Sequence, residues 1–323
     1  MKAMRAPICV AVAALFLSLS VGTPASAKQD EASRLDKKAE ELFQAGKYAA
    51  AISVARQSLA IREKALGPDH PEFATALNNL AVLHYNKGNY TEAEQMYKRA
   101  LSIEEKTLGA DHTEVASTLN NLGELYRTQE RYAEAAPLLK RSIAIREKAV
   151  GPDHPDIAPA LSNLAAVYTN QGQYGEAEPL FKRALAILDK DGPSNDPDAT
   201  ILLNNLASLY YNLERYGEAE ALLKRSLTLA KKTLGPDHPN VAQSLNTLAA
   251  VCGRQGRSAD AEQLFKLSIA TYEKTLGPTH PEVIGVVDNL ARFYKEQGRH
   301  ADAAPLFKRV KASRQKADGG NRI

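Results

Sequence analysis

The stretch that decides the fold runs from Gly67 to Glu72 and reads Gly-Pro-Asp-His-Pro-Glu. Close copies begin at Gly109, Gly151, Gly235 and Gly277, at spacings of 42, 42, 84 and 42 residues. A degenerate copy at 193–198 fills the longer gap, because Asp-Pro-Asp stands there in place of His-Pro-Asp. A fixed period of this length is the signature of a repeat protein.

Three further landmarks keep the same period and need no insertion. The first is Tyr48, Tyr90, Tyr132, Tyr174 and Tyr216, continued by Ser258 and His300. The second stands two residues earlier and is Gly in five of seven units, with Glu130 and Glu214 in the other two. The third is an alanine row at Ala93, Ala135, Ala177, Ala219, Ala261 and Ala303. Landmarks that stay in phase over seven units define the unit as 42 residues long.

Each unit has the apolar spacing of two amphipathic helices joined by a short turn. In residues 71–108, Pro71 suits a first helical turn, Gly88 marks the turn between the helices and Gly109 ends the second helix. Small residues at Ala81, at Ala93 and at their equivalents let the two helices approach closely, and Gly123 is the smallest of them. One pair of helices cannot bury its apolar stripes alone, so neighbouring pairs must stack.

The runs Leu77-x-Asn79-Leu80-Ala81-x-x-x-Tyr85, Gly88-x-Tyr90 and Ala93…Tyr97-x-x-Ala100 resemble the tetratricopeptide repeat. The 42-residue length and the linker are most similar to the kinesin-light-chain type. This resemblance implies an all-α, right-handed superhelical solenoid of about seven helix-turn-helix repeats, with first helices lining an inner groove and second helices forming the outer wall. The repeats expected are about 30–66, 67–108, 109–150, 151–192, 193–234, 235–276 and 277–316, followed by a disordered tail at 317–323.

The first 27 residues have the pattern of a secretory signal peptide. Lys2 and Arg5 precede an uncharged apolar run, and small residues ending at Ala27 follow it. We expect cleavage after Ala27 and a periplasmic or secreted protein. The alternative is an uncleaved membrane anchor, but the apolar run is shorter than the roughly 20 residues that a membrane-spanning helix needs. We therefore expect no stable membrane span after cleavage.

Composition and charge limit the function classes. Apolar residues make up 44% of the chain and charged residues 24%, which is ordinary for a folded protein. The net charge of +3 includes the two basic residues of the leader, so the remainder is nearly neutral and has no electrostatic footprint for nucleic acid. No nucleophile with its base, phosphate-binding loop or metal-ligand cluster is present in the sequence. We expect no enzyme activity, cofactor or metal.

The strongest functional signal is an Asn ladder in two adjacent rows of the first helices. The rows are Asn79, Asn121, Asn163, Asn205 and Asn289, with Thr247 in the remaining slot, and Asn78, Asn120, Asn204 and Asn246, with Ser162 and Asp288. An Asn side chain has a donor and an acceptor, so it matches a peptide backbone. The family frame places both rows in the groove, where they would bind an extended peptide. The alternative is that these side chains link adjacent helices and fix register.

Variable positions of the same face would set specificity. Tyr85, Arg127, Tyr211 and Arg254 are the candidates in this set, and drift is the alternative explanation for their variation. Arg254 lies near Arg292 and Lys295 in the repeat frame, which predicts a weak preference for acidic ligand residues at the C-terminal end.

Other recurring residues are interpreted structurally. The linker histidines are expected to cap helices rather than to bind zinc, because their linkers are spaced too widely to share one ion. The Lys-Arg pair of each second helix could form a basic stripe, but acids four residues earlier indicate a self-compensated outer face. Cys252 replaces a Tyr and is expected to be a buried thiol rather than a nucleophile. Pro137, Pro159, Pro179 and Pro305 should bend their helices slightly.

The sequence therefore predicts a protein-interaction scaffold that holds an extended segment of a protein or peptide partner in its concave groove. The alternative is an architectural spacer or a self-assembling structural protein of the cell envelope.

Overall fold

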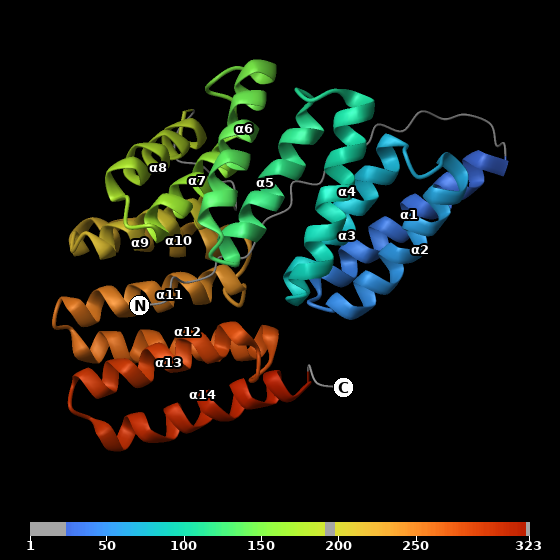
Figure 1. Ribbon diagram of the computed structural model, residues 1–323. Coiled ribbons are helices and arrows are strands. Elements are labelled where there is room, and N and C mark those ends of the chain that lie inside the picture. Colours follow the sequence, from blue (N-terminus) through green and yellow to red (C-terminus); the bar gives the residue numbers. More distant parts are fainter. Residues whose placement is uncertain (1–23, 191–197, 321–323) are drawn as a thin grey trace. The chain divides into compact units, whose positions relative to one another are not determined.

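The computed structural model describes residues 24–190 and 198–320. These residues form fourteen α-helices and one short 3₁₀ turn, and no strand occurs within them (Figure 1). The helices are α1 Pro24–Gln44, α2 Tyr48–Leu66, α3 Pro71–Lys87, α4 Tyr90–Leu108, α5 Thr113–Thr128, α6 Tyr132–Val150, α7 Ala158–Asn170, α8 Tyr174–Leu188, α9 Asp198–Asn212, α10 Tyr216–Thr233, α11 Pro239–Arg254, α12 Ser258–Leu276, α13 Pro281–Glu296 and α14 His300–Gly320. The predicted all-α class and the seven helix pairs are confirmed.

The chain divides into two compact units at the turn between α7 and α8. Residues 24–171 form the N-terminal unit and residues 172–320 the C-terminal unit. Within each unit a second helix packs on its own first helix and on the first helix of the next repeat. First helices of successive repeats also contact one another, as α3 does with α5 and α9 with α11. The first-helix layer is therefore the tighter one inside each unit.

Linker histidines begin the first helices, as the sequence predicted. In five repeats the Nδ1 atom of the histidine accepts a hydrogen bond from the backbone N–H two residues later, as His70 does from Glu72 at 3.2 Å. The capping residues are His70, His112, His154, His238 and His280. The proline that follows in four of these repeats lacks an N–H group at a position where none is needed. The six-residue linker thus ends one helix and begins the next.

The turn between paired helices uses a left-handed backbone conformation. Gly88 has φ +88°, and the equivalent glycines of four other repeats are also positive. Glu130 and Glu214 occupy the same position at φ +63° and +59°. Side chains are disfavoured in this region, so the two glutamates hold a strained backbone.

Small residues make the close contact between paired helices. Ala81 and Ala93 are fully buried, as are most of their equivalents. A Cβ atom on Gly123 would lie 2.7 Å from Cγ of Leu139, so only glycine fits opposite this leucine. Buried serines add a polar link, because Ser142 Oγ donates to the carbonyl oxygen of Ala116 at 2.7 Å and Ser58, Ser226 and Ser268 repeat this bond.

Two predicted segments lie largely outside the described residues. The leader lies outside the described residues except for its last four, which are the first residues of α1; the linker at 193–198 lies outside them except for Asp198. The fourth repeat opens with a 3₁₀ turn at Pro155–Ile157, because Pro155 and Pro159 lack backbone donors close together. The last helix continues to Gly320, beyond the predicted start of the tail at 317. α6, α8 and α14 continue through Pro137, Pro179 and Pro305.

Among the described residues, no helix is both long enough and apolar enough to cross a membrane.

Candidate functional site

The two rows of the Asn ladder are hydrogen bonded to each other between neighbouring repeats. Asn121 Nδ2 donates to Asn78 Oδ1 at 3.2 Å. The same Asn bridge joins Asn163 to Asn120 at 3.0 Å and Asn289 to Asn246 at 3.1 Å. The side of the first helices that carries these bridges is the first-helix face. Linking adjacent helices, the alternative role predicted for this ladder, is therefore present at three junctions.

The bridge leaves part of each amide unused. Asn121, Asn163 and Asn289 are half-buried, and within the described chain their Oδ1 atoms accept no hydrogen bond and are not buried. Asn79 begins its row, is exposed, and makes no bridge within the described residues. An oriented and accessible carbonyl oxygen is an acceptor for a peptide N–H group. Bridging and ligand binding are thus compatible in one side chain.

The ladder changes between the fifth and sixth repeats. Thr247 replaces the bridging Asn, and Asn204 Oδ1 instead accepts from Ser244 Oγ at 2.9 Å. Asn204 Nδ2 is buried without a partner, and so are both polar atoms of the Asn240 side chain and Oε1 of Gln243. Leaving such groups unpaired costs about 1–3 kcal/mol each. Sequence analysis missed Asn240, although an acid stands at this position in the five other linker-led repeats.

Tyr85 and Arg127 belong to one network between α3 and α5. Tyr85 Oη bonds to Thr128 Oγ1 at 2.8 Å and to Glu124 at 3.3 Å, while Arg127 forms a buried ion pair with Glu124 at 2.5 Å. Burial alone would lower the pKa of Arg127, but the Glu124 carboxylate raises it above its ordinary value. Burial and the same carboxylate raise the pKa of Tyr85. Both predicted specificity residues are therefore engaged within the chain.

Tyr211 and Arg254 form the corresponding pair in the C-terminal unit. Arg254 Nε donates to Tyr211 Oη at 3.0 Å, and its guanidinium lies 6.0 Å from the centre of the ring. Arg254 is exposed and Tyr211 is half-buried. Arg292, expected to add to the basic end, is paired with Asp288 at 3.0 Å. The predicted cationic character is therefore partly neutralised.

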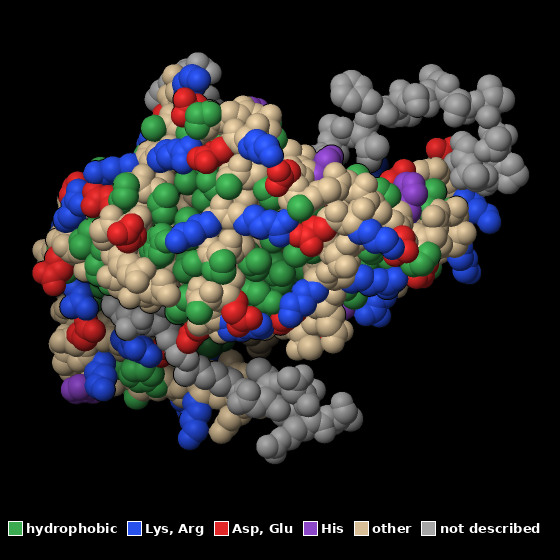
Figure 2. Space-filling view, turned by 45° about the horizontal axis from the view of Figure 1, so that its top comes forward, with side chains coloured by type: hydrophobic (Ala, Val, Ile, Leu, Met, Phe, Trp, Pro, Cys, Tyr) green, Lys and Arg blue, Asp and Glu red, His purple; other side chains and the backbone are tan. Residues whose placement is uncertain are grey.

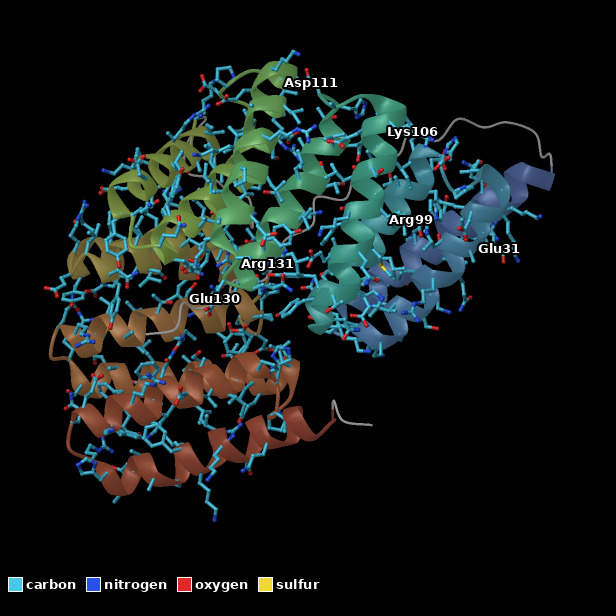
Figure 3. All side chains as sticks on the ribbon, viewed as in Figure 1. Glu31, Arg99, Lys106, Asp111, Glu130 and Arg131 are labelled. Atoms are coloured by element: carbon cyan, nitrogen blue, oxygen red, sulfur yellow. The ribbon has the colours of Figure 1, made fainter. Side chains whose placement is uncertain are left out.

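The outer side of the helix pairs is held by a recurrent ionic contact that the sequence analysis did not find. A second-helix Glu bonds to an Arg just before the second helix of the next repeat, as Glu94 does to Arg131 at 2.7 Å. Figure 3 labels Arg131 beside Glu130. We call this contact the outer clasp. It recurs at Glu178–Arg215, Glu220–Arg257 and Glu262–Arg299. The constant spacing of 37 residues between the two partners was the available signal.

The Lys-Arg pair of the second helices is compensated, as predicted. Lys98, Lys182 and Lys224 each bond to the acid four residues earlier. Lys266, which is followed by Leu267 instead of Arg, does the same. The Arg of the pair reaches the preceding second helix, as Arg141 does to Glu105 at 2.6 Å. We call this contact the second-helix pair. Figure 2 shows the result, with basic and acidic side chains interspersed over one face.

Cys252 is buried, as predicted, and its Sγ lies 2.5 Å from an Arg257 nitrogen. Burial raises the pKa of this thiol, which keeps it protonated and a poor nucleophile. No group of His, Cys, Asp and Glu suited to a metal ion occurs within 24–190 or 198–320.

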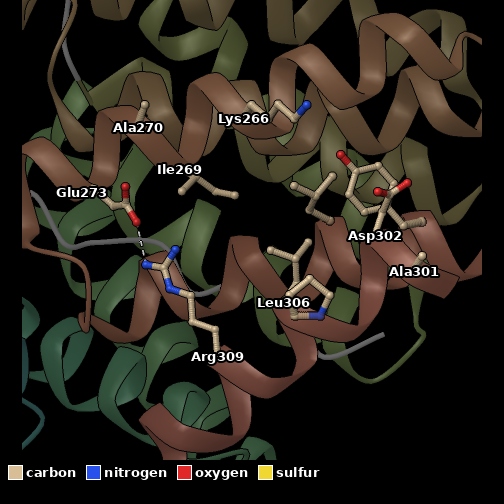
Figure 4. A pocket seen from close by; sticks show the side chains of 11 residues that line it. Lys266, Ile269, Ala270, Glu273, Ala301, Asp302, Leu306 and Arg309 are labelled. Carbon is tan, nitrogen blue, oxygen red and sulfur yellow. Dashed lines mark hydrogen bonds and ion pairs between the residues drawn. The ribbon is translucent and has the colours of Figure 1, made fainter. Parts of the chain in front are cut away.

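A surface pocket lies between α12 and α14 over α13 (Figure 4). Its volume is about 430 Å³; Leu290 and Leu306 are among the apolar residues lining it. The Glu273–Arg309 ion pair of 2.6 Å forms part of the lining. This is the space between two second helices, and it brings together no set of reactive groups.

Fold and contacts together define a class, the helix-pair repeat proteins that act as protein-interaction scaffolds. Tetratricopeptide repeat models match residues 31–103, 72–148, 131–190 and 198–274, and another matches residues 285–317. The chain therefore belongs to the tetratricopeptide repeat family. No curated protein matches it.

Solved structures agree with the kinesin-light-chain type. Kinesin light chain TPR-like repeats from Podosopora anserina are 28% identical over 64% of this chain and 98% of that one, with a TM-score of 0.52. BtubC (BKLC) from P. vanneervenii is 18% identical over 72% and 91%, with a TM-score of 0.54. The apo form of RapI is 17% identical over 90% and 99%, with a TM-score of 0.64. The last two share the fold.

Proposed function

We propose that this protein binds an extended segment of a protein partner along the first-helix face. The observation that carries the proposal is the Asn bridge, which fixes one N–H group of Asn121, Asn163 and Asn289 and leaves the carbonyl oxygen accessible. Packed helices lie about 8–10 Å apart, and an extended chain advances about 3.3 Å per residue. Oriented oxygens on successive repeats then meet every third backbone N–H group of the ligand.

Binding through backbone groups makes the ladder tolerant of ligand sequence. Each such hydrogen bond adds about 0.5–1.5 kcal/mol. Side chains beside the ladder would then discriminate between ligands. Arg254, held by Tyr211, offers its exposed guanidinium to an acidic ligand residue.

We place this activity in the cell envelope or outside the cell. The support is the leader-like pattern of residues 1–27. N-terminal sequencing of the exported chain tests it, with a new terminus at Lys28 as the expected result.

The alternative, an architectural role by end-to-end assembly, has less support. The outer clasp needs a Glu on the second helix, and the seventh repeat has Ala304 at that position. The last second helix thus lacks the acid that binds the next repeat at four other junctions. A new copy added in register would find no clasp acceptor, as is also the case at the internal junctions after Ile52 and Ala136.

Site-specific photo-crosslinking tests the proposal directly. A crosslinking amino acid placed at Ser208, on the first-helix face, should capture the partner. The same amino acid at exposed Lys224, on the outer side of α10, is the matched control. Equal capture from both positions, or capture from Lys224 alone, would contradict binding on the first-helix face.

A further inference from the structure

The junction between the fifth and sixth repeats, α9–α10 against α11–α12, differs from the next junction of the C-terminal unit, α11–α12 against α13–α14. The first junction, α1–α2 against α3–α4, also has few of these contacts, because Ile52 and Asn89 stand at its clasp positions. Elsewhere neighbouring repeats are tied by up to three contacts: the Asn bridge, the outer clasp with its Tyr, and the second-helix pair. At this junction each of the three is missing or weakened, and the hydrogen bonds that cross it instead include Ser244–Asn204, Ser226–Ser244 and Arg254–Tyr211. The substitutions lie at three separate positions, one on the first-helix face and two on the outer side.

No Asn stands at the bridge position of this junction on the first-helix face. Thr247 stands where Asn121, Asn163 and Asn289 donate at the other junctions. Buried polar atoms of Asn204, Asn240 and Gln243 have no hydrogen-bond partner. Separation of α9 from α11 would hydrate these groups, which lowers the free energy of the open state relative to the other junctions.

The second-helix pair is absent on the outer side. Position 231 is Lys and position 267 is Leu, where other junctions have an acid and an Arg. Three of those junctions hold the contacts Glu105–Arg141, Asp189–Arg225 and Glu273–Arg309 at 2.5–2.6 Å, and the first holds Glu63–Arg99 at 3.5 Å. Leu267 has 49% of its surface exposed and is one of two exposed large apolar side chains in the described chain.

The outer clasp is present but weakened. Arg257 bonds to Glu220 at 3.0 Å, yet its neighbour on α11 is Cys252 instead of a Tyr. In the clasps of Arg131, Arg215 and Arg299 the guanidinium lies 4.0–4.2 Å from the centre of a Tyr ring. Cys252 offers Arg257 no aromatic ring, so stacking is lost here.

We propose that this junction is a built-in hinge, at which α9–α10 and α11–α12 separate reversibly while the rest of the C-terminal unit stays folded. Opening uncovers Cys252, which lies between α10 and α11 under Arg257 and Glu220. It also exposes the amides of Asn204, Asn240 and Gln243. The structure therefore contains its own reporter, because the thiol is 1% exposed when the junction is closed.

Thiol labelling of the full chain tests the hinge. The chain carries Cys9→Ser, so that Cys252 is the only thiol, and a disulfide reagent measures its labelling rate across a urea series. Circular dichroism follows global unfolding in the same series. The hinge predicts labelling below the unfolding transition with a much weaker urea dependence than global unfolding. Labelling that follows global unfolding at every urea concentration would overturn it.

Repair of the junction gives the second measurement. Lys231→Glu combined with Leu267→Arg restores the second-helix pair and should slow labelling about fivefold. The matched control is Glu273→Lys combined with Arg309→Leu, which imposes the same gap on the next junction and should leave the rate unchanged. Thr247→Asn, nearly equal in volume, should slow labelling by restoring a bridge donor. If both repairs leave the rate at its original value, or the control variant changes it as much as they do, the hinge is not at this junction.

Discussion

Asn121 donates a hydrogen bond from Nδ2 to Oδ1 of Asn78, which lies 43 residues earlier on the preceding first helix. The bond sets the direction of the amide before any ligand arrives. A preorganised acceptor loses less side-chain entropy on binding than a free one. The same bond therefore contributes both to the stability of the repeats and to their affinity for a ligand. Substitutions are needed that change one of these properties without the other.

The Asn ladder gives a matched pair of substitutions. Asn121→Ala should cost about 1 kcal/mol of stability and weaken partner binding, because it removes a bridge and an acceptor. Asn79→Ala should weaken binding and leave the melting temperature unchanged, since Asn79 makes no bridge within the described chain. Thermal melting and titration with the crosslinked partner measure both effects. Normal binding by the Asn79 variant would make the ladder a purely structural device.

The strained turns predict two stabilising substitutions. Glu130→Gly and Glu214→Gly should each raise the free energy of unfolding by roughly 1 kcal/mol, because glycine adopts positive φ without steric cost. Gly88→Ala is the reverse change at the equivalent position and should destabilise by a similar amount. Urea unfolding of the three variants checks the set. A loss of stability in both glycine variants would show that the Glu side chains have a role outweighing the strain.

Much of the fold could be predicted from the sequence, because the residues that mark the helix ends recur every 42 residues. Gly67–Glu72 and the Tyr90 landmark place every helix pair, and the linker histidines cap as expected. The contacts between repeats were harder to predict. Tyr85 meets Thr128 and Glu94 meets Arg131 at spacings of 43 and 37 residues. These spacings join residues of different repeats, so helical periodicity inside one repeat does not reveal them.

In the candidate site, too, the repeated residues could be predicted from the sequence and the contacts between repeats could not. The Asn rows stand out because they repeat, but their role in bridging needed the spatial arrangement of neighbouring first helices. Arg127 looked like a specificity residue because it varies between repeats. Its partner Glu124, three residues earlier on α5, is replaced together with it: the next repeat has Ala166 and Thr169 at these positions. Positions that vary between repeats therefore include residues that bond to each other inside one repeat, as well as residues that would contact a ligand.

Glu104 predicts an unusual dependence of stability on pH. Burial raises its pKa to about 7, Thr118 opposes the shift, and the charges of Glu114 and Glu105 add to it. The folded state holds this proton while the unfolded state loses it near 4.5. The stability that comes from holding this proton in the folded state is fully present below about pH 4.5. It is lost as pH rises to about 7, which lowers the free energy of unfolding by ~3 kcal/mol.

Glu104→Gln isolates this effect, because glutamine has a similar shape and does not titrate. Its free energy of unfolding should vary less between pH 5 and 8 than that of the native chain, and the variant should be the more stable of the two at pH 8. Glu92→Gln, an exposed change on the same helix, is the control and should keep the native profile. Parallel pH profiles for the native chain and Glu104→Gln would contradict the raised pKa.

The outer clasp predicts the opposite sign at acidic pH. Arg299 and Lys266 hold the pKa of Glu262 at about 2, so the folded state favours the carboxylate. The resulting stability is present above the unfolded value near 4.5 and is lost as pH falls toward 2. Each clasp adds ~1 kcal/mol after allowance for screening by solvent.

Glu262→Gln should therefore destabilise the chain at pH 7 and make little difference at pH 2.5. Ala304→Gln changes the equivalent position of α14, which no further repeat follows among the described residues, and should be neutral at both values. Combining Glu262→Gln with Arg299→Gln should cost less than the sum of the single changes at pH 7, because either change alone already breaks the pair. Additive losses would mean that the two charges stabilise the chain separately and that the clasp does not couple the sixth repeat to the seventh.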